Sequence, residues 1–193
     1  ESLVWGRQRL REECGGLTYE FAAGSFFQTN TRAAGILFAT VAEFAALLGG
    51  ETVFDCCCGA GAIALSLAER AGRVLGFEAS AGATGDAGAN ARRLGLKNCR
   101  FVAGDLARTL FAPGLPVPDV LVADPPRAGL DEAVLTRFME LAPGRIVYVS
   151  CDPSTLARDL GRLSLAYRVA QVRPVDLFPH SHHVESVALL LRR

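Results

Sequence analysis

The stretch ETVFDCCCGAGAIALSLAER, residues 51–70, contains an apolar run, a glycine-containing turn and a helical pattern in direct succession. The apolar run at 52–56 is typical of a buried strand, and residues 61–70 have the spacing of a helix. Gly59 and Gly61 lie in the turn between them, where the absence of a Cβ lets a ligand approach the backbone closely. This order predicts an α/β protein with a ligand-binding turn.

The same alternation of strand and helix patterns continues along the chain. Apolar runs that predict buried strands follow at 73–78, 99–103, 119–123 and 145–150, and helical stretches follow at 81–94, 131–141 and 154–163. Strands that alternate with helices predict a parallel sheet with helices on both faces. The last two runs, 166–175 and 184–191, are joined by a stretch too short for a crossover helix, so we expect them to pair antiparallel.

These patterns together predict a Rossmann-like α/β fold. It is a mostly parallel seven-stranded sheet closed by an antiparallel C-terminal hairpin, which is the architecture of class I methyltransferases. Upstream, residues 17–23 alternate like a strand and residues 31–48 have helical spacing. We expect residues 1–24 to be the tail of a preceding segment and residues 25–193 to form one domain, since this length is sufficient for a single core.

The composition is typical of a soluble globular enzyme. Half of the residues are hydrophobic and 21% are charged, and the formal net charge is zero, so no overall basic field indicates nucleic acid. The six cysteines have neither CxxC spacing nor the density of a secreted disulfide scaffold, which favours free thiols in a reducing cytoplasm. The sequence shows no signal peptide and no apolar stretch of membrane-spanning length, so we expect a cytoplasmic protein that is not membrane-bound.

Carboxylates at two predicted strand ends are candidates for ligand binding. Glu78 ends a strand about twenty residues after the glycine turn, where a carboxylate accepts hydrogen bonds from both ribose hydroxyls of a nucleoside. Asp105 follows the next strand and is expected either to contact an adenine amino group or to cap a helix. Ala64 stands where the dinucleotide fingerprint has its third glycine, which favours S-adenosylmethionine over a nicotinamide cofactor.

Later strand ends carry side chains suited to chemistry. The fourth sheet strand runs into Asp124-Pro125-Pro126-Arg127, whose prolines predict a rigid loop that holds Asp124 and Arg127 at the crevice. The fifth runs into Cys151, which precedes an expected helix N-terminus. This position favours a lowered thiol pKa and a nucleophile, and a buried structural cysteine is the alternative. The loop at 176–185 contains all three histidines of the chain but no matching ligands, so we expect no metal site.

Five segments, taken in order, resemble the RNA (uracil-5-)-methyltransferase family. They are FFQTN (26–30), DCCCGAG (55–61), DPPRAG (124–129), YVSCDPSTLARD (148–159) and DLFPHSHHVE (176–185). The proline, cysteine and histidine–glutamate motifs occurring together distinguish this family from other class I methyltransferases.

The resemblance implies a role for each matching position. Cys151 corresponds to the family's nucleophile and Glu185 to its general base. Including the ligand-binding turn, the expected cofactor-binding residues are Gln28, Cys57, Gly59, Gly61, Ala62, Glu78, Asp105 and Asp124, and the expected residues at the target base are Gln28, Asp124 and Arg127. Cys57 stands where relatives often have an aromatic residue, and Ala62 where some carry a polar contact with the cofactor.

The resemblance also implies S-adenosylmethionine as cofactor and a transfer or ribosomal RNA as substrate. We expect a monomer whose RNA-binding domain lies outside this sequence, and residues 25–193 as the catalytic domain. One alternative is an RNA cytosine carbon-5 methyltransferase, although such enzymes typically have a second cysteine in the proline motif, which here reads DPPR. Amino-group methyltransferases usually have an aromatic residue after the prolines, and a catalytically weak RNA-binding fragment is a third alternative.

Overall fold

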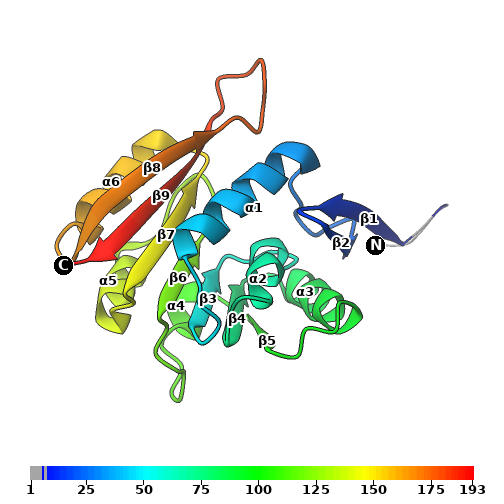
Figure 1. The fold of residues 1–193 in the computed structure, drawn as a ribbon, viewed down its shortest axis with the longest axis horizontal. Coiled ribbons are helices and arrows are strands. Elements are labelled where there is room, and N and C mark those ends of the chain that lie inside the picture. Colours follow the sequence, from blue (N-terminus) through cyan, green and yellow to red (C-terminus); the bar gives the residue numbers. More distant parts are fainter. Residues whose placement is uncertain (1–5, 7) are drawn as a thin grey trace.

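A computed structural model of the chain describes Gly6 and residues 8–193. A seven-stranded sheet lies at its centre in the order β5-β4-β3-β6-β7-β9-β8 (Figure 1). The strands are β3 (Thr52–Cys56), β4 (Arg73–Glu78), β5 (Cys99–Ala103), β6 (Val120–Ala123), β7 (Arg145–Ser150), β8 (Tyr167–Val175) and β9 (Glu185–Arg192). All neighbours from β5 to β7 pair parallel, whereas β9 pairs antiparallel with both β7 and β8. The predicted mostly parallel sheet with an antiparallel hairpin is confirmed.

Helices cover both faces of this sheet, as the sequence predicts (Figure 1). They are α1 (Thr31–Ala45), α2 (Ala62–Ala68), α3 (Ala81–Arg93), α4 (Leu106–Thr109), α5 (Glu132–Leu141) and α6 (Pro153–Leu163). Along β3, Val53 packs into one hydrophobic cluster with residues of α1 and α2, and the next residue, Phe54, packs into a second cluster with residues of α5 and α6. Because successive side chains of a strand point to opposite faces, this alternation creates two cores, one on each side of the sheet.

A separate hairpin, β1 (Arg9–Cys14) and β2 (Leu17–Ala22), lies beside α3 (Figure 1). The alternating pattern at 17–23 correctly predicts β2, but β1 was not predicted. The sequence of β1, RLREEC, has five exposed residues and one buried residue, so its amphipathic signal is weak. The described residues contain no helix long and apolar enough to cross a membrane.

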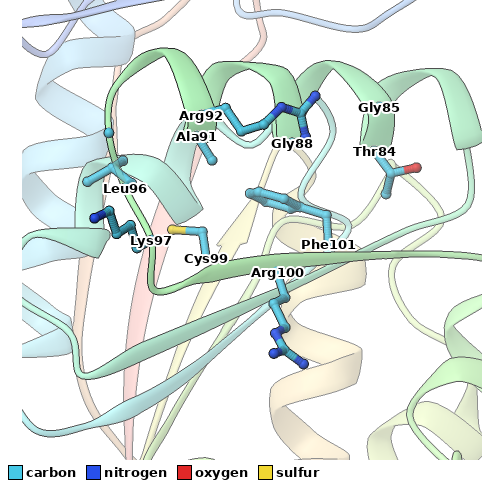
Figure 2. Close-up of a pocket in the computed structure, with 11 residues that line it drawn as sticks. Thr84, Gly85, Gly88, Ala91, Arg92, Leu96, Lys97, Cys99, Arg100 and Phe101 are labelled. Atoms are coloured by element: carbon cyan, nitrogen blue, oxygen red, sulfur yellow. The ribbon is translucent and has the colours of Figure 1, made fainter.

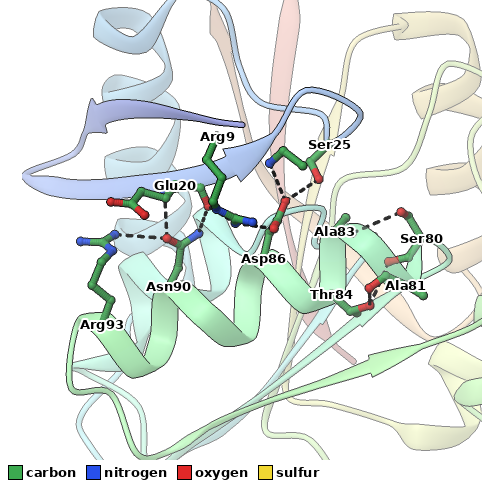
Figure 3. A network of polar contacts seen from close by, with 11 residues as sticks. Arg9, Glu20, Ser25, Ser80, Ala81, Ala83, Thr84, Asp86, Asn90 and Arg93 are labelled. Atoms are coloured by element: carbon green, nitrogen blue, oxygen red, sulfur yellow. Dashed lines mark hydrogen bonds and ion pairs between the residues drawn. The ribbon is translucent and has the colours of Figure 1, made fainter. Parts of the chain in front are cut away.

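Two polar residues of α3 hold this hairpin in place (Figure 3). The Asn90 side chain accepts a hydrogen bond from the Glu20 amide at 2.8 Å and donates one to the Glu20 carbonyl at 3.0 Å. Asp86 accepts hydrogen bonds from the Ala22 amide at 2.8 Å and from the Ser25 hydroxyl at 2.7 Å, and it forms an ion pair with Arg9. These contacts fix the point at which β2 enters the FFQTN segment.

Candidate active site

A cavity of about 720 Å³ opens at the carboxyl ends of the parallel strands. In an open α/β sheet this edge is where ligands bind. The lining residues come from the segment before α1, from the ends of β3 to β7 and the loops after them, and from the segment that leads into β9. They are Phe26, Gln28, Cys57, Gly59, Phe77, Glu78, Ala79, Gly104, Asp105, Leu106, Asp124, Pro125, Pro126, Arg127, Cys151, Phe178 and Glu185. Nine of the predicted site residues are in this set, so the sheet brings together segments that are far apart in the sequence.

Gly61 and Ala62 are the two predicted residues that do not line this cavity. Gly61 has φ = 85° and precedes α2, and a Cβ at this position would lie 2.9 Å from the Ala87 Cβ. Its glycine therefore permits a left-handed turn and close packing against α3. Ala62 instead lines a smaller cavity of about 40 Å³, together with the buried carboxylate of Asp55.

The glycine turn is tied to the end of the next strand by the carboxylate of Glu78. One oxygen of Glu78 accepts a hydrogen bond from the Gly59 amide at 3.0 Å, and the other accepts one from the Ser80 amide at 2.9 Å. Each carboxylate oxygen has a further lone pair, so Glu78 can still accept hydrogen bonds from a ligand in the cavity. Asp105 lines the cavity and also caps α4, because its side chain accepts a hydrogen bond from the Ala107 amide at 2.8 Å. The predicted helix cap by Asp105 is confirmed, and its contact with an adenine amino group stays a prediction.

Cys151 and Glu185 are placed opposite each other by the register of two strands. Ser150 at the end of β7 pairs with Ser186 in the antiparallel strand β9. One residue beyond this pair, Cys151 and Glu185 therefore occupy neighbouring positions, and both line the cavity. Glu185 is only 5% exposed, whereas Cys151 is partly exposed.

Two carboxyl groups of this site, Asp124 and Glu185, have raised pKa values. Burial raises the pKa of Asp124 to about 7, and the negative charge of Glu185 contributes to the shift. Burial also raises the pKa of Glu185, while Arg127 opposes this effect. The negative charge of Glu185 therefore favours the protonated form of Asp124.

The expected lowering of the Cys151 pKa is wrong for this structure. Burial raises the pKa of the thiol, and Glu185 raises it further. Asp124 adds to the increase, whereas the backbone at Cys151 and the nearby Arg127 counter it. A position before a helix N-terminus lowers a thiol pKa only if it outweighs burial and adjacent carboxylates, and here it does not.

Two family models of methyltransferases match this chain. The family model described as tRNA (uracil-5-)-methyltransferase matches residues 117–193, which contain the strand ends of Asp124, Cys151 and Glu185. A second model, described as a methyltransferase domain, matches residues 53–122.

Individual proteins match over nearly the whole chain. Two proteins named as uncharacterized RNA methyltransferases are similar: one from Nitratidesulfovibrio vulgaris is 47% identical over 186 residues, and one from Porphyromonas gingivalis is 46% identical over 195 residues. They match 94% and 98% of this chain, which covers 40% and 42% of their lengths. The crystal structure of Pyrococcus abyssi tRNA (uracil-54, C5)-methyltransferase in complex with S-adenosyl-L-homocysteine has a TM-score of 0.85 and is 35% identical. That match covers 97% of this chain and 45% of the other.

The chain is similar to RNA (uracil-5-)-methyltransferases in its sequence and in its fold. It spans about two fifths of the length of the curated relatives that it matches. The sequence resemblance, drawn from five motifs, is therefore confirmed.

The family's DPPR loop is held in this chain by Asp159 and Arg158 of α6. Asp159 is fully buried and accepts hydrogen bonds from the Tyr148 hydroxyl at 2.5 Å and from the Leu130 amide at 2.9 Å. Arg158 donates to Asp159 at 2.8 Å and to the Ala128 carbonyl at 2.7 Å. Both residues belong to the YVSCDPSTLARD motif, but no role was predicted for them from the sequence. The only signal in the sequence was an acidic residue at a position of α6 that faces the sheet.

The histidine loop, residues 176–185, contacts the DPPR loop through Arg127. The Arg127 guanidinium lies 3.1 and 3.2 Å from the two ring nitrogens of His183. Burial lowers the pKa of His183, and the neighbouring His182 and Arg127 lower it further. Among the described residues, no group of three or more His, Cys, Asp and Glu side chains is arranged to hold a metal ion.

Aromatic residues at the cavity were not predicted as site residues. Phe26 is 70% exposed although it lines the cavity, and Phe178 and Phe77 line it too. An aromatic side chain this exposed at a concave site is suited to contact a planar ligand. Phe26 belongs to the FFQTN motif, but only Gln28 of that motif was predicted as a site residue.

Proposed function

We propose that this chain is the catalytic region of an enzyme that methylates carbon 5 of a uridine in RNA. The single observation that carries the proposal is the juxtaposition of Cys151 and Glu185, a nucleophile and a base, in one cavity. The proposed catalytic domain comprises residues 25–193, and the substrate is a transfer or ribosomal RNA.

The cavity suits S-adenosylmethionine as cofactor. Its volume of about 720 Å³ is within the usual range of ligand sites. The Gly59 turn and the carboxylates of Glu78 and Asp105 offer a close backbone approach and acceptors for ribose hydroxyls and an adenine amino group. When bound, the cofactor supplies an electrophilic methyl group on its sulfonium.

The residue types match the reactivity of uracil. Carbon 5 is too weak a nucleophile to take a methyl group directly. The Cys151 thiol first loses its proton to solvent, and the thiolate forms a bond to carbon 6. The electron pair of the carbon 5–carbon 6 double bond moves toward the carbon 4 oxygen, and the resulting enolate is nucleophilic at carbon 5. Arg127 and Gln28, which line the same cavity, are placed to stabilise the negative charge on the base oxygens.

Product release needs a base. After carbon 5 has gained the methyl group, Glu185 takes the proton from carbon 5, the double bond forms again, and the Cys151 thiolate leaves carbon 6. The burial that raises the pKa of Glu185 makes this carboxylate a stronger base than an exposed one. The target uridine must be unpaired or flipped out of its helix to reach this cavity.

The proposal is tested with RNA that contains 5-fluorouridine. Fluorine cannot be removed as a proton, so the wild-type protein is expected to form a covalent complex with this RNA that survives denaturation, in the presence of S-adenosylmethionine. Cys151→Ala is expected to form none and to lose methyl transfer, while its affinity for S-adenosylmethionine stays within a few-fold. Substantial methyl transfer by Cys151→Ala would exclude Cys151 as the nucleophile.

A further inference from the structure

A second cavity, of about 820 Å³, lies between α3 and the edge strand β5 (Figure 2). We call it the edge groove. One wall is the surface of α3 at Gly85, Gly88 and Ala91, where the near absence of side chains leaves the helix open to close approach. Cys99 and Phe101 of β5 point toward this helix and form the floor (Figure 2). No residue that lines the edge groove also lines the active-site cavity.

The charges of the edge groove have one sign. Arg92, Lys97 and Arg100 line it, and none of its lining residues is acidic. Within the described residues, these three side chains form no hydrogen bond or ion pair, whereas other arginines, such as Arg158 and Arg173, are paired with carboxylates. A chain with no net charge thus has a concave surface with unpaired cations only, which attracts a polyanion.

The three cations take different positions along the edge groove. Arg92 extends along α3 toward Gly88, and its guanidinium lies 3.5 Å from the place where a Cβ of Gly88 would be (Figure 2). Lys97 lies at the far end of the helix, after the α3 C-terminus (Figure 2). Arg100 leaves β5 on the side away from Phe101 (Figure 2). A series of separated cations matches the repeating phosphates of a nucleic acid strand better than a single small anion.

The edge groove also contains an aromatic ring, that of Phe101. Phe101 is partly exposed and is held by two glycines, since a Cβ at Gly76 would lie 2.5 Å from its ring and a Cβ at Gly61 would lie 3.3 Å away. Grooves that bind single-stranded nucleic acid combine cations for the backbone with aromatic faces for the bases. The edge groove has both elements.

The edge groove also starts close to the active site. Phe101 and Gly104, which lines the active-site cavity, are three residues apart, so along an extended strand they are separated by about 10 Å. Thr84, at the near end of the edge groove, lies in the first turn of α3, just after Glu78 and Ser80. A strand with one nucleotide in the cavity can therefore continue into the edge groove within a few nucleotides.

We propose that the edge groove binds an unpaired stretch of the RNA substrate through its phosphates, beside the nucleotide that enters the active site. This inference rests on the proposed function, because it assumes an RNA substrate. The open edge of β5 also suits the addition of a strand from a protein, but the acid-free lining favours a polyanion. Arg92 and Lys97 are the principal phosphate contacts.

The test uses the full-length protein that carries this chain and a fluorescently labelled, unstructured RNA that contains uridine. Arg92→Gln/Lys97→Gln is compared with Arg162→Gln/Arg168→Gln. This control removes the exposed Arg168 and the partly exposed Arg162, which pairs with Glu132, near the opposite edge of the sheet. RNA affinity is measured over a range of salt concentrations without S-adenosylmethionine. Unfolding curves of both variants verify that they are folded.

The edge-groove variant is expected to bind RNA more weakly than the control. The slope of log affinity against log salt is expected to fall by about 0.7 for each lost phosphate contact of a single strand, or about 1.4 for the pair. The KM for RNA is expected to rise, with kcat at saturating RNA unchanged. If the edge-groove variant has the same RNA affinity and the same salt slope as the control variant, the inference is overturned. This holds even if the edge groove binds a protein strand at β5. A wild type that binds RNA with this slope but transfers no methyl group would refute the proposed function and leave the edge groove standing.

Discussion

The Tyr148 hydroxyl donates a hydrogen bond of 2.5 Å to the buried carboxylate of Asp159. Tyr148 belongs to β7, which runs into Cys151, and Asp159 belongs to α6, which begins two residues after Cys151. The contact thus closes the strand–helix unit that presents the nucleophile. Through the Leu130 amide, the same carboxylate also fixes the end of the loop that carries Asp124 and Arg127.

We expect Asp159→Ala to lower the free energy of unfolding by about 3 kcal/mol or more, because it leaves several buried donors without an acceptor, each at a cost of about 1–3 kcal/mol. Tyr148→Phe removes one donor and is expected to cost about 1 kcal/mol. Asp131→Ala is the control, since Asp131 is exposed and makes no side-chain cap to α5. Urea unfolding measures all three, and an Asp159→Ala variant as stable as Asp131→Ala would contradict the prediction.

Glu185→Gln is expected to stop the reaction after methyl transfer, because the amide cannot take the proton from carbon 5. The variant should accumulate as a covalent complex with methylated RNA. A cofactor with a labelled methyl group and a denaturing gel would reveal it as a slowly migrating, labelled band. Adding Cys151→Ala to the variant should abolish the band. If Glu185→Gln is folded and turns over at nearly the wild-type rate, Glu185 is not the base.

Glu78→Ala is expected to weaken S-adenosylmethionine binding by about 1.5–3 kcal/mol, the scale of hydrogen bonds to a charged group. Glu78→Gln should lose less, because its amide oxygen can still accept a hydrogen bond from the Gly59 amide. Glu69→Ala, at an exposed position after α2, is the matched control. Calorimetric titration measures the affinity of each variant for S-adenosylmethionine. An unchanged affinity of Glu78→Ala would mean that Glu78 binds only the Gly59 and Ser80 amides and not the cofactor.

The pH dependence of methyl transfer should follow Cys151 and Glu185, whose pKa values are both raised. Both groups act in their deprotonated forms, so kcat/KM should increase with pH through the neutral range. Arg127 lowers both pKa values, so Arg127→Gln should move the profile to higher pH. A profile that stays in place or moves to lower pH would contradict this assignment of charges.

Stability should depend on pH through Asp124. Burial raises its pKa in the folded chain to about 7, above that of an exposed aspartate, so the folded state holds this proton more tightly than the unfolded state. The stabilisation from the protonated form is complete below the unfolded pKa and is lost as the pH rises through about 7. Asp124→Asn should therefore flatten the decrease in unfolding free energy between about pH 4 and about pH 7, measured with urea. An unchanged slope would show that Asp124 is ionised throughout.

The fold was largely predictable because strands with buried faces on both sides give continuous apolar runs. The limits of β4, 73–78, and of β7, 145–150, agree with their predicted runs. Elements held by polar contacts were harder to predict. The strand β1 depends on pairing with β2, and α4 has only four residues, so neither gives a periodic signal of its own.

Most site positions were also predictable, because parallel strands bring their carboxyl ends to one edge. The sequence could not reveal the electrostatic balance at Cys151. That balance depends on Glu185, which is adjacent only because β9 pairs with β7. The edge groove was not predicted either, since its wall and floor belong to separate elements whose glycines and cations have no distinctive spacing.

The strand β9 lies between β7 and β8, although it follows both of them in the chain. During synthesis, one edge of β7 therefore stays unpaired until β9 has left the ribosome. Glu185, which lies next to Cys151 in the folded chain, is the first residue of β9. Such a long-range pairing delays folding and leaves an apolar strand available for contacts with other chains. Ribosome-bound chains that stop before Glu185 should therefore be sensitive to protease and prone to aggregate, while chains that include β9 should be protected.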